Sequence, residues 1–319
     1  MTRPIVGIDL GGTQVRAVVA TADGTILARV STPTAPQEGQ SAVVERIVDA
    51  AKSVIRAAGN GTPRGVGVGS AGAIDPVSGM VLSAPNLLWT DVPLRALLEE
   101  RLGLPVVVGN DANAAALAEH RFGAGQGVSD LIYLTISTGI GAGIISGGRL
   151  LLGQRGLAGE VGHMSIDPQG PLCLCGNRGC LEALASGPAI AAAALARIAQ
   201  GEPSCILTLA QGDPTQVTAQ VVARAAAEGD ALAGDLIRRV AHSIGVGLVN
   251  LIHILAPEII LIGGGVAQVG SPLLSAIRAV VSERAMGCFV DRLRIELAPL
   301  GNDVGVLGAV ALFLSHEHD

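Results

Sequence analysis

The feature that most constrains this chain is a short segment that carries four metal-binding side chains. His163, Cys173, Cys175 and Cys180 follow an H-x9-C-x-C-x4-C spacing. Three thiolates and one imidazole suit a closed tetrahedral zinc site. Because protein ligands would fill every position, none is left for a metal-bound water, and the zinc would shape the structure rather than perform chemistry. The run from 171 to 180 is rich in glycine and polar residues, which predicts a loop.

Two other interpretations of these cysteines stay open. They are unrelated buried or reactive thiols, or some of them form disulfides. The chain has five cysteines, an odd number, and shows no secretory signature, and Cys173 and Cys175 are too close to pair easily. A reducing cytoplasm is therefore the expected compartment. Cys205 and Cys288 have no partner spacing and are expected to be buried thiols.

Composition excludes several classes of protein. A chain of 319 residues with 49% hydrophobic and 15% charged residues is globular and long enough for two domains. The net charge of -6 argues against a nucleic-acid partner. Lys52 is the only lysine, so no Walker P-loop can be written. The most apolar segment, 246–263, is interrupted by polar residues, so no membrane span is expected.

Short β-rich runs alternate with Ala- and Leu-rich helical stretches, which is typical of an α/β protein. The first half predicts strands at 4–10, 14–20 and 25–31, a helix at 41–58, strands at 65–69 and 105–109, and a helix from Asp111 to Phe122. The second half predicts strands at 131–137 and 142–146, helices at 187–200, 216–227 and 231–254, a strand at 258–262 and a last helix at about 303–314.

Each half opens with two strands around a glycine-rich tip, and this weak repeat indicates a duplicated fold with a cleft between the halves. We predict a small N-terminal α/β domain over 1–112. A large C-terminal α/β domain would cover 113–302 and contain the zinc loop 163–180. The C-terminal helix, about 303–319, is expected to pack back on the small domain.

The two glycine-rich tips are candidate phosphate loops. They read Asp9-Leu10-Gly11-Gly12-Thr13 and Ser137-Thr138-Gly139-Ile140-Gly141. Glycine lets backbone N–H groups approach an anion closely. Without a P-loop lysine, these amides, the two threonines and a metal would have to manage the phosphates. Asp9 ends its strand, where its carboxylate is well placed to hold Mg²⁺ directly or through water.

Three adjacent glycines, Gly263, Gly264 and Gly265, follow an apolar strand and leave a flat surface where a purine and a ribose could lie. A flexible strand-to-helix turn is the simpler interpretation of the same residues. A dinucleotide-binding fold is the obvious competitor for the glycine tips. It needs G-x-G-x-x-G at a strand-to-helix turn, whereas Gly11 and Gly12 lie between two predicted strands.

A candidate general base follows the strand at 105–109. Asp111 could cap the next helix, or it could take a proton from a substrate hydroxyl. Carboxylates and amides elsewhere form a set that suits a polyol. This set is Asn86, Asn110, Glu160, His163 and Glu182. If one ring nitrogen of His163 binds zinc, the other becomes a donor for a sugar oxygen. The remaining histidines, His120, His242, His253, His316 and His318, are assigned no role.

Several of these motifs together resemble one known family. The segments are Asp9-Leu-Gly-Gly-Thr13, Thr138-Gly-Ile-Gly-Ala-Gly143, Glu160-Val-Gly-His163 and Cys173-Leu-Cys-Gly-Asn-Arg-Gly-Cys-Leu-Glu182. They resemble the ROK family (repressors, open reading frames and sugar kinases), and within it the bacterial ATP-dependent glucokinases. The resemblance covers nearly the whole chain, and the cysteine-rich segment is its most specific part.

The resemblance implies a two-domain actin/hexokinase-like (ribonuclease H-like) fold that binds ATP and Mg²⁺ in its cleft. By motif position, Asp111 corresponds to the catalytic base. Asn86, Asn110, Glu160, His163 and Glu182 correspond to the sugar contacts, and His163 and the three cysteines correspond to the zinc ligands. A homodimer or homotetramer is implied. No DNA-binding helix-turn-helix precedes Met1, so the repressor branch is disfavoured.

The expected reaction is phosphoryl transfer from ATP to the 6-hydroxyl of glucose. A kinase for another hexose or N-acetylhexosamine, such as N-acetylmannosamine, N-acetylglucosamine, mannose or fructose, is the alternative within enzymes, and polyphosphate is an alternative donor. A non-catalytic sugar sensor with the same fold is the alternative from another class.

Overall fold

The computed structural model describes residues 3–59 and 61–317. The chain forms two compact units. Unit 1 comprises Met1–Ser129, Gly143–Gly159 and Pro299–Asp319, and unit 2 comprises Asp130–Ala142 and Glu160–Ala298. The last segment therefore belongs with the first part of the chain. Residues 113–129 belong to unit 1. The boundary at residue 112 between a small N-terminal and a large C-terminal domain stays a prediction. His318, in the predicted C-terminal helix, lies outside the described residues.

Unit 1 is built on a five-stranded sheet of order β3-β2-β1-β4-β8. The strands are β1 (Ile5–Leu10), β2 (Gln14–Ala20), β3 (Ile26–Pro33), β4 (Val66–Ser70) and β8 (Val106–Asn110). The first three are antiparallel neighbours, and β1, β4 and β8 run parallel. All five strands were predicted, with ends that differ by one or two residues.

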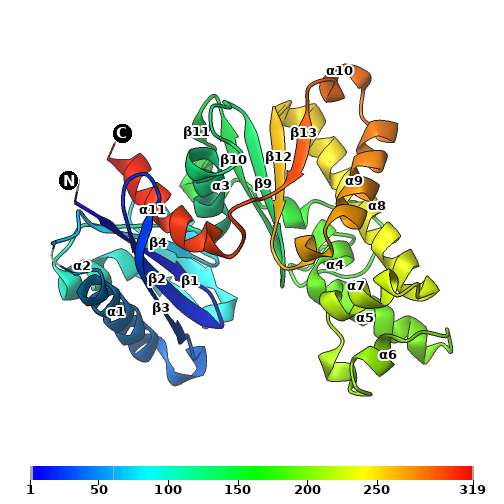
Figure 1. Ribbon diagram of the computed structural model, residues 1–319, viewed down its shortest axis with the longest axis horizontal. Coiled ribbons are helices and arrows are strands. Elements are labelled where there is room, and N and C mark those ends of the chain that lie inside the picture. Colours follow the sequence, from blue (N-terminus) through cyan, green and yellow to red (C-terminus); the bar gives the residue numbers. More distant parts are fainter. Residues whose placement is uncertain (1–2, 60, 318–319) are drawn as a thin grey trace. The chain divides into compact units, whose positions relative to one another are not determined.

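The two faces of this sheet are covered by different helices (Figure 1). Alternate residues of β1, β4 and β8 (Val6, Ile8, Leu10, Val66, Val68, Val106 and Val108) pack with α1 (Gln40–Ala57) and α2 (Leu94–Leu102) in one core. A second core joins Ile5 and Val18 to α11 (Val304–His316). Helix α3 (Asp111–Phe122) packs against α11. The predicted helices at 41–58, from Asp111 and at 303–314 are confirmed.

Helix α11 lies very close to the sheet because two strand residues there lack side chains. A Cβ added to Gly67 would lie 1.8 Å from the carbonyl oxygen of Ala309, and one added to Gly7 would lie 2.4 Å from that of Val306. On its other side, a Cβ on Gly308 of α11 itself would meet the backbone of Ala114 in α3 at 2.6 Å. The alternation of valine and glycine in 65–69 therefore has a cause: valines fill one core and a glycine admits a helix backbone on the opposite face.

The C-terminal end of α3 holds a buried carboxylate. Glu119 is fully buried and accepts hydrogen bonds from the backbone N–H of Ala124 (3.3 Å) and of Leu300 (3.1 Å). Burial raises the pKa of this carboxyl, and the two backbone donors oppose the rise. Glu119 thus fastens the segment that leads into α11 to the helix that begins with Asp111.

Unit 1 also contains a small meander that the sequence analysis did not predict. Strands β5 (Ala73–Asp75), β6 (Met80–Ala84) and β7 (Trp89–Val92) form an antiparallel three-stranded sheet. These strands are short and only partly polar, so they show no clear hydrophobic alternation. The sheet carries the 3-10 turn η2 (Pro85–Leu87) that contains Asn86.

The second five-stranded sheet has the order β11-β10-β9-β12-β13. Its strands are β9 (Leu131–Ile136), β10 (Ile140–Ser146), β11 (Arg149–Leu150), β12 (Ile259–Gly263) and β13 (Arg294–Leu297). Numbered by appearance, both sheets have the order 3-2-1-4-5, and in both the central strand runs parallel to the fourth. The repeat inferred from the two glycine tips is therefore present in the topology.

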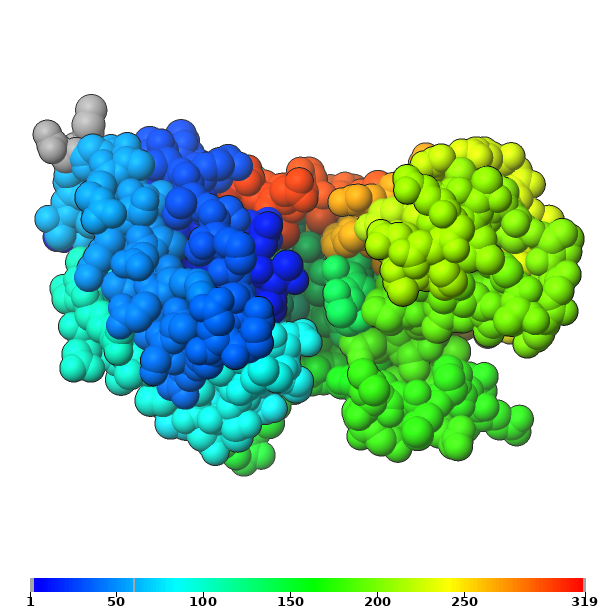
Figure 2. All heavy atoms as spheres, turned by 90° about the horizontal axis from the view of Figure 1, so that it is seen from below, coloured from blue at the N-terminus to red at the C-terminus, as the bar shows by residue number. Residues whose placement is uncertain are grey.

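The helices of unit 2 come between β11 and β13 in the chain. They are α4 (Leu181–Ala185), α5 (Gly187–Ala199), α6 (Ile206–Leu209), α7 (Ala219–Ala227), α8 (Ala231–Leu255), α9 (Ser271–Arg284) and α10 (Gly287–Val290). The predicted helices α5, α7 and α8 are confirmed, with α7 starting three residues later than expected. The yellow-green atoms in Figure 2 show that the α5–α7 layer lies at the surface of its unit. None of the described helices is both long and apolar enough to cross a membrane.

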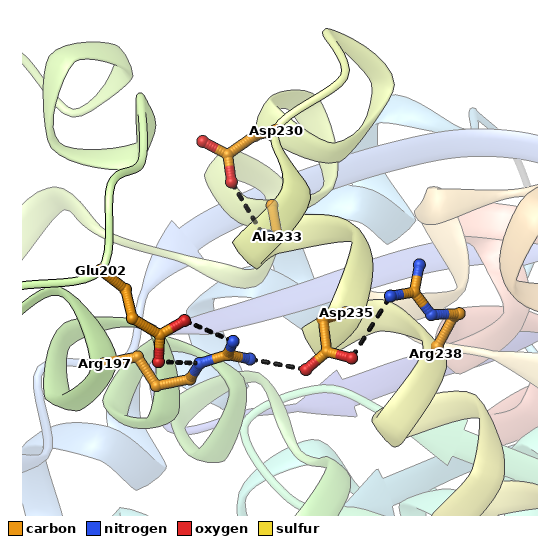
Figure 3. A network of polar contacts seen from close by, with 6 residues as sticks. All are labelled: Arg197, Glu202, Asp230, Ala233, Asp235 and Arg238. Atoms are coloured by element: carbon orange, nitrogen blue, oxygen red, sulfur yellow. Dashed lines mark hydrogen bonds and ion pairs between the residues drawn. The ribbon is translucent and has the colours of Figure 1, made fainter.

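A network of charged side chains fastens α5 to α8 (Figure 3). The guanidinium of Arg197, at the end of α5, lies between the carboxylates of Glu202 and Asp235, and Asp235 also pairs with Arg238. Asp230 caps α8 through the Ala233 N–H at 2.9 Å. The Arg197 guanidinium lowers the pKa of the carboxyls of Glu202 and Asp235. These contacts fix the outer end of α5, the helix whose first turn lines a pocket of unit 2.

Two cysteines differ from expectation. Cys288 is exposed and Cys205 is half-buried, so the prediction that both are buried thiols is wrong. Cys205 directly precedes α6, where its backbone N–H donates to Asp230, and Cys288 lies in the short helix α10. Neither lies in a long apolar segment that would bury it.

We predict that Gly67→Ala lowers the free energy of unfolding by about 1–3 kcal/mol or more, because the added methyl meets the α11 backbone and cannot be accommodated without a shift. The control is Gly69→Ala in the same strand, where the nearest atom to the added methyl, the Ala114 side chain, is 3.4 Å away. Urea denaturation of both variants measures the difference. Equal stability of the two variants would show that the packing of α11 does not require the missing side chain at Gly67.

Candidate functional site

The predicted site residues of unit 1 lie at the carboxyl ends of three parallel strands. The strand register aligns Leu10, Ser70 and Asn110 across β1, β4 and β8. Asp9 precedes the first of these residues and Asp111 follows the last. Ligands of open α/β sheets bind at this edge, outside the carboxyl ends of the strands. The fold therefore brings two carboxylates that are far apart in sequence to the same edge.

Asp9 is a largely buried carboxylate with one cationic partner. It forms an ion pair with Arg16 on the neighbouring strand β2. Burial raises the pKa of Asp9, while the charge of Arg16 opposes the rise. The carboxylate also faces the first turn of α11, since a Cβ on Gly305 would lie 2.5 Å from an Asp9 oxygen. Its oxygens suit Mg²⁺ as ligands, and such a cation would share the carboxylate with Arg16.

Asn110, and not Asp111, is the N-cap of α3. The Asn110 side-chain oxygen accepts from the N–H groups of Ala112 (2.9 Å) and Asn113 (3.1 Å), and its amide donates to the Gly72 carbonyl (3.1 Å). Asp111 occupies the first helical position, where its carboxylate accepts from the Ala112 N–H at 2.8 Å. The positive end of the helix favours an ionised carboxylate there. The capping role weighed for Asp111 thus falls to its neighbour.

The first glycine tip is packed against Asn86. A Cβ added to Gly12 would lie 3.0 Å from both the Cβ and the carbonyl oxygen of Asn86, so glycine allows the tip and the η2 turn to meet. Thr34 fixes the base of the tip by donating from its hydroxyl to the Gly11 carbonyl at 2.6 Å. Thr13 is exposed at the end of the tip. Asn86 was predicted to bind substrate, and the structure places its exposed side chain beside this tip.

The predicted residues of unit 2 also converge. The second glycine tip is closed by a hydrogen bond from the Ser137 N–H to the Gly139 carbonyl (2.8 Å), and the Ile140 N–H donates to the carboxylate of Glu182 (2.8 Å). The same tip touches the short turn η4 (Val161–His163), since a Cβ on Gly162 would lie 2.1 Å from the Ile140 carbonyl oxygen. His163 follows that glycine and Glu160 is the N-cap of the same turn, so the candidate phosphate and sugar groups lie together.

The four predicted metal ligands form a compact cluster. The ligand atoms of His163, Cys173, Cys175 and Cys180 all lie within 4.8 Å of one another. Two of these separations, from Cys173 Sγ to His163 Nδ1 and from Cys175 Sγ to Cys180 Sγ, are 3.7 Å. The edge of a tetrahedron with zinc–ligand bonds of 2.0–2.3 Å is about 3.5–3.8 Å. The donor set and its spacing therefore fit a metal.

The surroundings of the cluster also fit a structural metal site. Burial raises the pKa of the Cys180 thiol to about 12, while a backbone hydrogen bond at Asn177 lowers the pKa of Cys175. A cation would displace the Cys180 proton and hold all three sulfurs as thiolates. Because His163 faces the sulfurs with Nδ1, its Nε2 remains available for another contact.

A pocket in unit 2 was not predicted as a whole. It has a volume of about 280 Å³ and is lined by the second glycine tip, the start of α5, the start of α7 and Gly265 with Val266. Ser137, Thr138 and Gly265 had been singled out, but Gly187, Thr218 and Gln220 had not. Thr218 caps α7 by accepting from the Val221 N–H, a capping signal that the sequence offered. The Gln220 amide nitrogen lies 3.2 Å from the position of a Cβ on Gly265.

The residues chosen from the sequence thus fall into two sets. Unit 1 groups Asp9, Gly11, Gly12, Thr13, Asn86, Asn110 and Asp111, and unit 2 groups Thr138, Gly139, Gly141, Glu160, His163, Glu182, Gly263, Gly264, Gly265 and the three cysteines. Within each unit the members lie on connected turns and strand ends. The sequence analysis missed Arg16, Thr34 and Gln220.

Comparison with known proteins agrees with this arrangement. The family model described as "ROK family" matches residues 5–316. A glucokinase of Thermotoga maritima is 38% identical over 309 residues, which cover 97% of this chain and 96% of the relative. A xylose repressor of Caldicellulosiruptor bescii is 35% identical over 98% of this chain and 78% of its own length.

A solved structure resembles this one over nearly its full length. It is a ROK family glucokinase from Streptomyces griseus in complex with glucose and AMPPNP, with a TM-score of 0.85 and 37% identity, covering 97% of this chain and 98% of that one. Together with the repeated sheet order, this likeness confirms the expected actin/hexokinase-like α/β fold. With a family model that spans residues 5–316, the chain belongs to the ROK family.

Proposed function

We propose that this protein transfers the terminal phosphoryl group of ATP to the 6-hydroxyl of glucose, which gives glucose 6-phosphate and ADP. The observation that carries the proposal is the full-length likeness to glucokinases, one of which was solved with glucose and AMPPNP. The position of Asp111 in the first turn of α3, at the carboxyl edge of the sheet, supports it.

Asp111 is the proposed general base. Its carboxylate would accept the proton of the 6-hydroxyl as the oxygen attacks phosphorus, while the helix start favours the ionised form beforehand. Asn86, Asn110, Glu160, Glu182 and Nε2 of His163 would orient the sugar through hydrogen bonds. Much of the rate of phosphoryl transfer comes from such positioning and from charge stabilisation.

The glycine tips are the proposed phosphate contacts. The backbone amides of Gly11, Gly12, Gly139 and Gly141, with the hydroxyls of Thr13 and Thr138, would donate to phosphate oxygens. Asp9 would hold Mg²⁺, which when bound neutralises phosphate charge. The pocket beside Gly265 would take the purine and ribose, and Gly263 and Gly264 would lead the chain from β12 to it.

The cluster of His163 and three cysteines is proposed to hold zinc as a structural ion. Thiolate and imidazole ligands suit zinc better than magnesium or calcium. A reducing compartment such as the cytoplasm would keep the thiols available. A homodimer or homotetramer is the proposed assembly, which light scattering on purified protein measures directly.

A coupled ADP-release assay over a panel of hexoses and N-acetylhexosamines, with ATP and polyphosphate as donors, tests the reaction. Glucose with ATP should give the highest kcat/KM. Sugar binding without sugar-dependent ADP release would instead favour a sensor, the class suggested by the repressor relative.

Asp111→Asn should lower kcat by about two to four orders of magnitude, because the amide cannot accept the hydroxyl proton. Glucose should still bind, which calorimetry measures independently of turnover. Asp49→Asn, an exposed change on α1, is the matched control and should leave kcat unchanged. Near-normal turnover in the Asp111 variant would remove this residue from its proposed role.

Cys175→Ser should lose the bound metal and raise the KM for glucose, because His163 and Glu160 sit on the turn that the metal would fix. Metal content by mass spectrometry and steady-state kinetics measure the two effects. Cys288→Ser, which changes an exposed cysteine outside the cluster, is the control. An unchanged KM for glucose in a metal-free Cys175 variant would show that the cysteine loop does not contribute to sugar recognition.

Gln220→Ala should raise the KM for ATP by about 3–10-fold, as expected for the loss of one neutral hydrogen bond. The KM for glucose should stay constant, because Gln220 lines only the pocket assigned to the nucleotide. Gln216→Ala, an exposed position just before α7, serves as the control. An unaltered KM for ATP would argue that the purine of ATP does not bind in this pocket.

A further inference from the structure

Unit 1 contains a cavity whose lining shares only Asn110 with the residues that have proposed roles. It has a volume of about 720 Å³, within the range of small-molecule sites. It is bordered by β8, by α3, by the turn before β11 and by the C-terminal part of α11. Every residue that lines it belongs to unit 1.

The charged side chains around this cavity have one sign. Its lining includes Arg121, Arg149, His120 and His316 but no aspartate or glutamate. Arg121 and Arg149 are exposed and form no ion pair within residues 3–59 and 61–317. His120 donates from Nε2 to the Val128 carbonyl at 2.9 Å, which fixes its ring. A rim of this kind is complementary to an anion, and guanidinium groups match phosphate oxygens well.

The wall of the cavity also contains an unsatisfied acceptor. Asn113 lines the cavity and is only 4% exposed. Across the part of the chain that the structure describes, its Oδ1 and Trp89 Nε1 are the only buried side-chain polar atoms that lack a hydrogen-bond partner. Buried acceptors are rarely left unpaired. Less than 1 Å² of this oxygen is accessible, so the Asn113 amide would have to turn to present it to the cavity. A ligand hydroxyl or amine could then donate to it, whereas a bare inorganic anion could not.

We propose that this cavity binds a small hydroxylated phosphate ester, with the phosphate at Arg121 and Arg149 and a hydroxyl donating to Asn113. Valine and leucine side chains, among them Val108 and Leu312, would contact its carbon skeleton. The product of the proposed reaction belongs to this chemical class, and the choice of that product as a probe is the only part of the inference that rests on the proposed function.

The site would act on the catalytic turn directly. Asn113 belongs to the first turn of α3, and Asn110, which also lines the cavity, caps that helix through the N–H groups of Ala112 and Asn113. Asp111 lies between these two asparagines in sequence. A ligand that engages Asn113 therefore contacts the turn that holds the proposed base, and of the proposed sugar contacts it would lie beside Asn110 alone.

Isothermal titration calorimetry on the full chain tests this proposal. Glucose 6-phosphate is titrated without nucleotide and with saturating glucose, which fills the sugar site. Binding should persist under these conditions. It should weaken at least about tenfold in Arg121→Gln/Arg149→Gln, as expected for the loss of charge-assisted hydrogen bonds. Arg56→Gln, an exposed change on α1, should bind as the unchanged protein does.

Two further variants separate the contribution of the arginines to binding from that of Asn113. Arg149→Gln alone should weaken binding and is a surface change that spares the core. Asn113→Leu should weaken glucose 6-phosphate but leave the weaker binding of inorganic phosphate, because only the ester carries hydroxyls. Loss of both ligands in equal proportion would contradict the assignment of Asn113.

Other outcomes would overturn the proposal. If glucose displaces the phosphate ester, the ester binds at the sugar site. If the double arginine variant binds it unchanged, the rim does not recognise phosphate. If that variant instead changes the mass of the particle in solution, a second copy of the chain covers the cavity. A failure of glucose-dependent ADP release would not alter these binding results, so the two proposals fail separately.

Discussion

The close approach of α11 to the first sheet is the constraint on which unit 1 depends. The helix backbone rests against Gly7 and Gly67, and Gly308 of the helix rests against α3, so three layers meet at positions without side chains. This packing holds the start of α11 beside Asp9 and the start of α3 at the sheet edge. Dense packing of this kind transmits small displacements. The positions of the Asp9 and Asp111 carboxylates therefore both depend on the packing of α11.

Much of the fold could be predicted because its strands and helices carry strong periodic signals. The buried strands β1, β4, β8 and β12 and the long helices α1 and α8 were expected within a few residues. The meander β5–β7 was not, because its strands are short and partly polar. Helix α9 was not predicted because it follows a glycine-rich segment with no clear start, and β13 was not because it has only four residues. The glycine-tip repeat was informative because it reflects the shared order of both sheets.

The site could be predicted only where chemistry fixes residue spacing. The metal cluster was predicted because four ligands of one ion must lie close together, and the structure brings them within 4.8 Å. The N-cap was assigned to Asp111 as an alternative, whereas Asn110 fills it, since either residue has the right side chain. Arg16 and Gln220 carried no local signal. Their positions beside the candidate site depend on strand register and on helix packing, which a single sequence does not display.

Glu119 gives α3 a second fixed point. Its buried carboxylate accepts hydrogen bonds from the backbone of Ala124 and Leu300. These two residues are near Ser129 and Pro299 in the sequence, at two of the four positions where the chain passes between the units. A twelve-residue helix is about 18 Å long and stiff. The contacts of Glu119 and the Asp111 turn are therefore the two ends of one stiff helix, so a displacement of Leu300 would tilt the turn that carries the Asp111 carboxylate.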